Sequence, residues 1–219
     1  VSADISSGKV VLLTGIRGSG RSALLDALIG LVPVSSGDII LGGRPLAEHN
    51  TLELRRRVAY LSEDDTVLPL SLRENVLLGT SGGDDVALRA LELAGLDLAL
   101  DTVMGNARML DESIAKDIGR GARERVCGAR AFARLLAGGA RLVLVDGLRG
   151  KGIEEGALVK RILTHRAGAT VIIVSDSPGN LGEQADQILC MDKGKIVQQG
   201  KHEDLLRDDG VYARLCGAQ

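Results

Sequence analysis

A glycine-rich segment, Gly15–Ser22, has the residue types and spacing that bind phosphate in many proteins. It reads Gly-Ile-Arg-Gly-Ser-Gly-Arg-Ser and lies between an apolar run and a predicted helix over residues 23–29. Glycine allows the backbone to curl so that successive N–H groups converge on phosphate oxygens, and the following helix adds the positive end of its dipole. Because glycines also form tight turns, the motif alone leaves a purely structural interpretation open.

The side chains of this P-loop motif have distinct predicted roles. Ser22 lies where a hydroxyl would ligate Mg²⁺, and Arg21 lies where the motif requires lysine. Arginine keeps the positive charge, but its planar guanidinium does not fit under the β- and γ-phosphates as a compact ammonium does. The predicted phosphate-binding residues are Gly15, Arg17, Gly18, Ser19, Gly20, Arg21, Ser22 and Ala23.

A carboxylate at the end of a second apolar run is the other candidate for binding the metal. Asp146 ends the sequence Leu-Val-Leu-Val-Asp, which begins at Leu142 and is typical of a Walker B strand. Its carboxylate would hold Mg²⁺ through a water molecule. An aspartate that ends a strand is also a common turn signal, so this motif by itself is weak evidence.

The elements that must position these residues are predicted from apolar periodicity. Four nearly continuous apolar runs are typical of buried, parallel strands. They cover Val10–Thr14, Leu142–Asp146, Thr170–Ser175 and Gln187–Met191. A long section over residues 70–136, rich in Leu, Ala and Arg with helical spacing, predicts an inserted helical subdomain, and Ser81–Asp85 within it predicts an exposed loop.

The composition predicts one globular domain over residues 1–219 and argues against several functions. Of its 219 residues, 45% are hydrophobic and 26% charged, enough for a substantial core. A net charge of −2 argues against binding duplex nucleic acid, and only two Tyr, one Phe and no Trp argue against stacking of exposed bases. The apolar stretch Leu24–Val34 contains Asp26 and Pro33 and is too short to cross a membrane.

The remaining reactive or charged residues favour ordinary structural roles. Three cysteines and three histidines are dispersed without the spacing of metal ligands, so we predict no zinc or redox site. The run Arg55-Arg56-Arg57 is predicted to be a solvated helix face rather than a patch for nucleic acid or lipid.

Taken together, these motifs resemble the nucleotide-binding domains of ABC transporters, and the exporter branch fits best. The resemblance covers nearly the whole chain. Its most specific parts are Ser71–Gly79 and Gly194–Leu206, the latter continuing to Tyr212–Leu215. The resemblance implies an α/β fold: a P-loop core with a mainly parallel sheet, an inserted helical subdomain, and an antiparallel β portion near the N-terminus.

Several residues that the family uses for catalysis are replaced. Gly147 follows Asp146, where the family carries the catalytic glutamate, and it has no side chain to act as a base. Asp176 follows the run Thr170–Ser175, where the family carries the switch histidine, and would face the γ-phosphate region as a like charge. Glu63 takes the place of the Q-loop glutamine; with Ser22 and Asp146, it completes the predicted metal ligands.

The signature motif and the D-loop also depart from the family pattern. Ile118–Ala122 aligns with the signature, where Gly119 lacks the serine hydroxyl and Arg120 places a bulky cation among the backbone amides. The flanking residues 123–131 are recognisable, whereas the D-loop region Leu148–Ile153 is far from the pattern. The aromatic residue that stacks on adenine in the family is expected before Val1.

The resemblance implies ATP and Mg²⁺ as cofactors, both weakly bound. The implied partners are a transmembrane domain, in the same or a separate chain, and a second nucleotide-binding domain as a homo- or heterodimer, without nucleic acid. This places the chain at the cytoplasmic face of a membrane. We expect a structural or regulatory subunit with little or no ATP hydrolysis; the alternatives are a slow but genuine ATPase that drives export and a protein-interaction adaptor that has kept only the fold.

Overall fold

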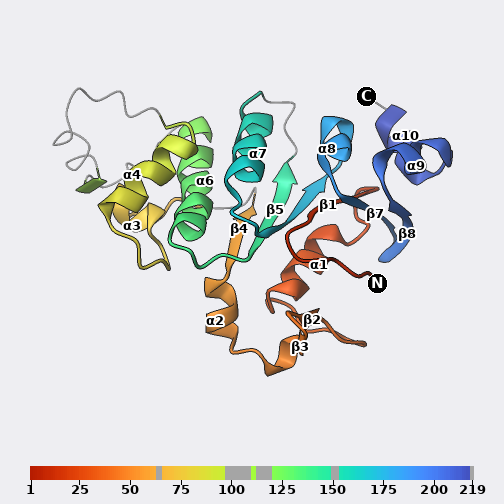
Figure 1. The fold of residues 1–219 in the computed structure, drawn as a ribbon, viewed down its shortest axis with the longest axis horizontal. Helices are drawn as coiled ribbons and strands as arrows, with labels where there is room; N and C mark the ends of the chain where they lie inside the picture. The colour runs from red at the N-terminus through yellow and green to blue at the C-terminus, as the bar shows by residue number, and fades with distance from the viewer. Residues whose placement is uncertain (63–65, 97–109, 112–119, 149–152, 218–219) are drawn as a thin grey trace. The chain divides into compact units, whose positions relative to one another are not determined.

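The computed structural model describes residues 1–62, 66–96, 110–111, 120–148 and 153–217, which form two compact units. The first unit consists of Val1–Arg55, Leu144–Gly150 and Gly168–Gln219. The second consists of Arg56–Val143 and Lys151–Ala167. Figure 1 shows the elements of both.

The first unit is built on the predicted parallel strands. They are β1 (Val10–Gly15), β5 (Leu142–Leu148), β6 (Thr170–Ser175) and β7 (Gln187–Asp192), with β8 (Lys195–Gly200) following on a tight turn. The strand order is β5-β6-β1-β7-β8; β1 is parallel to both β6 and β7, whereas β8 is antiparallel to β7. Leu12 pairs with Ile173 on one side and Ile188 on the other, and all three are buried. The predicted α/β fold with a mainly parallel sheet is confirmed.

Short helices complete the first unit. Helix α1 (Arg21–Leu28) follows β1, and α8 (Gly179–Gln184) follows β6; α9 (His202–Arg207) and α10 (Val211–Gly217) pack near β8 (Figure 1). The antiparallel β portion consists of a hairpin of β2 (Ile40–Leu41) and β3 (Arg44–Pro45), which precedes the 3-10 helix Leu46–Glu48 and α2 (Thr51–Arg56).

One arginine of the predicted solvated face has a structural role in this unit. Arg55, on α2, donates hydrogen bonds from Nε to the carbonyl of Ile29, 3.3 Å away, and from Nη2 to the carbonyl of Gly30, 3.1 Å away. These carbonyls lie just beyond the last turn of α1, where a helix leaves acceptors without intrahelical donors. Arg55 therefore caps α1 from outside, while Arg56 and Arg57 are exposed as predicted.

The second unit contains the predicted helical section. Its elements are β4 (Val58–Ser62), α3 (Leu72–Val76), α4 (Asp84–Leu93), α6 (Arg120–Leu136) and α7 (Ile153–His165), with α6 packed against the other four. Helix α3 begins with a capping box, in which Ser71 and Glu74 bond each other's backbone amides. The predicted loop Ser81–Asp85 is shorter than expected, because Asp84 and Asp85 form the first turn of α4, where carboxylates favour the helix dipole.

A buried asparagine joins the helices of the second unit. The Asn75 side chain donates to the backbone carbonyls of Leu68 and Ser71, both 3.0 Å away. Its Oδ1 accepts a 2.7 Å bond from Nη2 of Arg130 on α6, and its backbone carbonyl accepts a 2.8 Å bond from Nε of the same arginine. A buried amide is stable only when its donors and acceptors are paired, so this network fixes α3 against α6.

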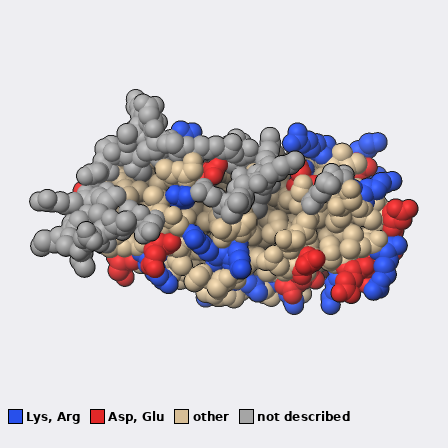
Figure 2. Space-filling view, turned by 90° about the horizontal axis from the view of Figure 1, so that it is seen from above, with Lys and Arg blue, Asp and Glu red and all other residues tan. Residues whose placement is uncertain are grey.

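Figure 2 shows acidic and basic side chains intermixed around the end that carries α9, where Arg207 lies 3.6 Å from Asp204 and 4.0 Å from Glu203. Within the ranges given above, no helix is long and apolar enough to cross a membrane.

The C-terminal helices are attached to the core of the first unit through Tyr212. Its ring is fully buried in a cluster with Leu12, Ile188, Cys190 and Leu205. Nδ1 of His202 lies 2.7 Å from the Tyr212 hydroxyl. This hydroxyl also lies against Gly182 on α8, where an added Cβ would lie 2.2 Å from the oxygen and 2.7 Å from Nδ1 of the histidine. Glycine is therefore required there by close packing.

We expect Gly182→Ala to destabilise the protein by about 1–3 kcal/mol, because the added methyl group must displace a well-packed aromatic ring. The free energy of unfolding from urea denaturation measures this change. Gly156→Ala is the matched control: Gly156 is exposed on α7 with no atom near the added Cβ, and alanine should stabilise that helix by about 0.5–1 kcal/mol. Equal effects of the two substitutions would contradict the packing argument.

Candidate functional site

The Gly15–Ser22 segment connects β1 to α1, as the P-loop motif predicts. An added Cβ at Gly15 would lie 2.1 Å from the carbonyl oxygen of Met191 on β7, so the two backbones approach too closely for any other residue. Helix α1 begins at Arg21, and its N-cap, Gly20, provides no side-chain hydrogen bond. The first N–H groups of a helix have no intrahelical acceptor, so they remain available to an anion.

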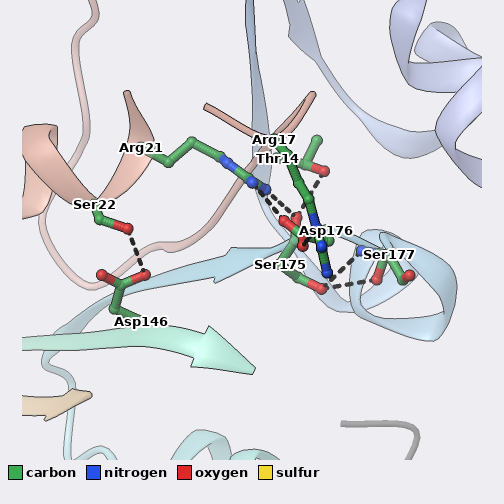
Figure 3. A network of polar contacts seen from close by, with 8 residues as sticks. All are labelled: Thr14, Arg17, Arg21, Ser22, Asp146, Ser175, Asp176 and Ser177. Carbon is green, nitrogen blue, oxygen red and sulfur yellow. Dashed lines mark hydrogen bonds and ion pairs between the residues drawn. The ribbon is translucent and has the colours of Figure 1, made fainter. Parts of the chain in front are cut away.

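A pocket of about 210 Å³ lies at this loop. Strands β1, β5 and β6 end beside it, because the carboxyl ends of parallel strands meet at one edge of the sheet. Figure 3 shows the polar side chains that converge there. The lining residues are Arg17, Gly18, Arg21, Ser22, Asp146, Gly147, Val174 and Asp176.

Arg21 is the buried cation of the pocket, with only 8% of its surface exposed. Its Nη1 donates a 3.0 Å hydrogen bond to the carbonyl of Ser175, at the end of β6. Its Nη2 donates to Oδ1 of Asp176, with which it forms an ion pair. The same Ser175 carbonyl accepts a 2.9 Å bond from the buried Thr14 hydroxyl. The guanidinium is thus held at two points.

Asp176 is placed between two arginines. Oδ2 lies 3.3 Å from Nε of Arg17, whose side chain is 80% exposed, while Oδ1 pairs with Arg21 (Figure 3). Partial burial raises the pKa of the Asp176 carboxyl, but hydrogen bonds and charges from Arg21 and then Arg17 outweigh it, so the pKa lies below its ordinary value. The carboxylate is therefore negatively charged at neutral pH.

Two predicted metal ligands lie together on the other side of the pocket. The Ser22 hydroxyl, on the first turn of α1, donates a 3.2 Å hydrogen bond to Oδ1 of Asp146 on β5. A hydroxyl and a carboxylate are the oxygen donors that Mg²⁺ uses beside nucleotide phosphates. No cluster of three or more His, Cys, Asp or Glu side chains suited to a metal occurs among the described residues.

Gly147 has a backbone conformation that restricts which residue can replace it. Its φ angle is +83°, in the left-handed region that residues with a Cβ adopt only at a cost. It lines the pocket directly after Asp146. The backbone at residue 147 thus favours glycine.

Ser19 indicates that the loop suits a phosphate group. This residue is only 2% exposed, and its hydroxyl has no hydrogen-bond partner among the described residues. A buried hydroxyl without a partner costs free energy, which an acceptor such as a phosphate oxygen would recover. The loop backbone and Ser19 therefore fit a phosphate, and Ser22 with Asp146 fits Mg²⁺, whereas Arg21 is directed to Asp176.

Several predicted site residues lie outside the described residues: Glu63, Ile118, Gly119 and most of the D-loop region, 149–152. Two residues of the site were not predicted. Thr14 and Ser175 are buried polar residues at the ends of apolar strands, and their contacts orient Arg21. A polar residue ending an otherwise apolar strand is the signal that would have identified them.

Comparisons with known proteins agree with this geometry. The model of the ABC transporter family matches residues 1–147. The chain is 30% identical to an ATP-dependent lipid A-core flippase of Photobacterium profundum, over 98% of this chain and 37% of the relative. It is 32% identical to the mesentericin-Y105 transport/processing ATP-binding protein of Leuconostoc mesenteroides, over 98% of this chain and 29% of the relative. The chain thus spans about a third of the length of these curated relatives.

A solved structure shows the same fold. The structure of a bacterial Atm1-family ABC exporter with ATP bound superimposes with a TM-score of 0.83 at 23% identity. The match covers 98% of this chain and 37% of that one.

We expect Gly147→Ala to lower the free energy of unfolding by about 1 kcal/mol or more, because alanine disfavours positive φ. Gly147→Asn is the control, since asparagine enters the left-handed region more readily and should cost less. Thermal or urea unfolding of both variants measures the difference. An alanine variant as stable as the wild-type protein would show that the backbone at residue 147 is not restrictive.

Proposed function

Because the chain belongs to the ABC transporter family, we propose that it is the nucleotide-binding domain of an exporter that binds ATP weakly and hydrolyses it little or not at all. In this role it serves as a structural or regulatory subunit. The observation that carries the proposal is the ion pair between Arg21 and Asp176, since the cation of the P-loop is bound to a carboxylate of the same pocket.

The retained parts of the site support nucleotide binding. Backbone N–H groups at the start of α1 and the Ser19 hydroxyl would bind phosphate oxygens. Ser22 and Asp146 would hold Mg²⁺, which neutralises phosphate charge when it is bound. Phosphate binding is weakened because Arg21 is already paired with Asp176. To contact a phosphate, the guanidinium must leave the Asp176 carboxylate or pair with the carboxylate and the phosphate at once.

The chemical requirements of hydrolysis support the second half of the proposal. Attack on a phosphate needs a positioned water molecule, which a side-chain base commonly orients and deprotonates. Gly147 offers no side chain beside Asp146, and Asp176 is engaged with two arginines. Among the described residues, the pocket therefore keeps groups for binding, and none of its side chains is placed to activate water.

Partners and location follow from the family. The relatives named above are a flippase and a transport/processing protein, each about three times as long as this chain. We infer that this domain acts with a transmembrane domain at the cytoplasmic face of a membrane and pairs with a second nucleotide-binding domain. Two copies of this chain would form a homodimer, and an intact partner would form a heterodimer.

An adaptor without nucleotide is the second candidate, and one observation favours it. Side chains of the pocket already pair with each other, since Arg21 bonds Asp176 and Ser22 bonds Asp146. A pocket whose charges are internally paired is stable without a ligand. In that case the fold would be retained only to bind another protein.

We expect millimolar Mg-ATP to raise the melting temperature, because a ligand that binds only the folded state stabilises it by RT ln(1 + [L]/Kd). At ten times Kd the gain is about 1.4 kcal/mol, and each kcal/mol corresponds to about 2–4 °C in a domain of this size. Magnesium alone and AMP are the controls. No shift at any nucleotide concentration would favour the adaptor.

We also expect that the double variant Arg21→Lys, Gly147→Glu does not recover ATP hydrolysis. The new carboxylate would extend from a strained backbone, and residues 118–122 would still depart from the family signature. Phosphate release by the purified double variant, compared with the wild-type chain, tests this. Turnover at a rate of about 1 s⁻¹ or more, within the usual range for enzymes, would show instead that the two substitutions alone explain the loss.

A further inference from the structure

The pocket contains an anion of its own. The Asp176 carboxylate lines it, and both of its oxygens face cations: Oδ1 pairs with Arg21, and Oδ2 lies 3.3 Å from Nε of Arg17 (Figure 3). All of these residues belong to the first unit. The arrangement is that of an anion-binding site in which the bound anion is a side chain.

The Arg21 guanidinium is not free to change partner without loss. It is 8% exposed, and its second contact, to the carbonyl of Ser175, fixes the plane of the group. If it turned away, a buried carbonyl and a partly buried carboxylate would each lose a donor. The residue in this position of a P-loop contacts the β- and γ-phosphates of a bound nucleotide. Asp176 therefore competes with the outer phosphates for the same cation.

The charges of the described residues that line the pocket are balanced. Arg17 and Arg21 contribute two positive charges, and Asp146 and Asp176 contribute two negative ones. A triphosphate carries more negative charge than a diphosphate, so the Asp176 carboxylate repels it more strongly. Ser22 and Asp146 would hold Mg²⁺, which would neutralise part of the phosphate charge of either nucleotide.

The groups without an assigned partner lie at the start of the loop and helix. They are the N–H groups of the first turn of α1 and the buried hydroxyl of Ser19. The pocket beside them has a volume of about 210 Å³. These donors would bind phosphate oxygens without displacing Asp176 from Arg21.

We propose that this pocket selects a nucleoside diphosphate over the triphosphate, with the Asp176 carboxylate taking the place of the terminal phosphate beside Arg21. The inference rests on the proposed function in one respect, namely that the pocket binds a nucleotide. It adds that the domain preferentially binds the diphosphate, and that the triphosphate does not readily displace the bound diphosphate.

Isothermal titration of the whole chain with ADP and with ATP, each with Mg²⁺, tests this selectivity. We expect ADP to bind at least about tenfold more tightly, a difference of about 1.4 kcal/mol. Asp176→Asn removes the charge at nearly constant size. In this variant ATP should bind as tightly as ADP, or more tightly. Asp208→Asn is the matched control, because Asp208 is exposed at the end of α9, and it should keep the wild-type ratio.

The outcomes separate the two proposals. Failure of both nucleotides to bind the wild-type chain would overturn the proposed function and this inference together. Binding of ATP as tightly as ADP, or an unchanged ratio in folded Asp176→Asn, would overturn the selectivity alone. If Asp176→Asn does not fold, competition on the wild-type chain decides: inorganic pyrophosphate should displace ADP more effectively than inorganic tripolyphosphate, and the reverse order would overturn the inference.

Discussion

The ion pair between Arg21 and Asp176 is the interaction on which the pocket depends. A guanidinium that is 8% exposed is stable only if a carboxylate or several acceptors compensate its charge. Asp176 and the Ser175 carbonyl provide that compensation from the end of β6. Arg21 and Asp176 therefore act as one unit: histidine at 176 with arginine at 21 would leave the buried cation without its carboxylate.

The parallel sheet makes this pairing possible. Strands β1 and β6 are neighbours in register, so the loop after β1 and the residues after β6 emerge at the same edge of the sheet. The Thr14 hydroxyl bridges the two strand ends through the Ser175 carbonyl, and Asp146 lies near the end of β5, the strand next to β6. Apolar strands buried on both faces provide a rigid support, so the polar groups at their ends lie in defined positions.

Much of this arrangement could be predicted from the sequence, because continuous apolar runs indicate parallel strands and a P-loop indicates a strand followed by a helix. That Arg21 and Asp176 each depart from the family pattern stays a prediction from the sequence. Their contact was not predicted, since they are 155 residues apart and only the strand order brings them together. The start of α4 was placed too late because Asp84 and Asp85 suit a loop and a helix N-terminus equally well. The role of Glu63 as a metal ligand stays a prediction, because Glu63 lies outside the described residues.

The positive φ of Gly147 has a consequence for protein engineering. Grafting a catalytic residue usually treats the main chain as a fixed scaffold that accepts any side chain. At residue 147 the backbone conformation favours glycine. The positive φ would therefore set the direction in which an introduced carboxylate side chain points. A design that introduces a carboxylate at residue 147 should therefore adjust the backbone path at the end of β5 together with the side chain.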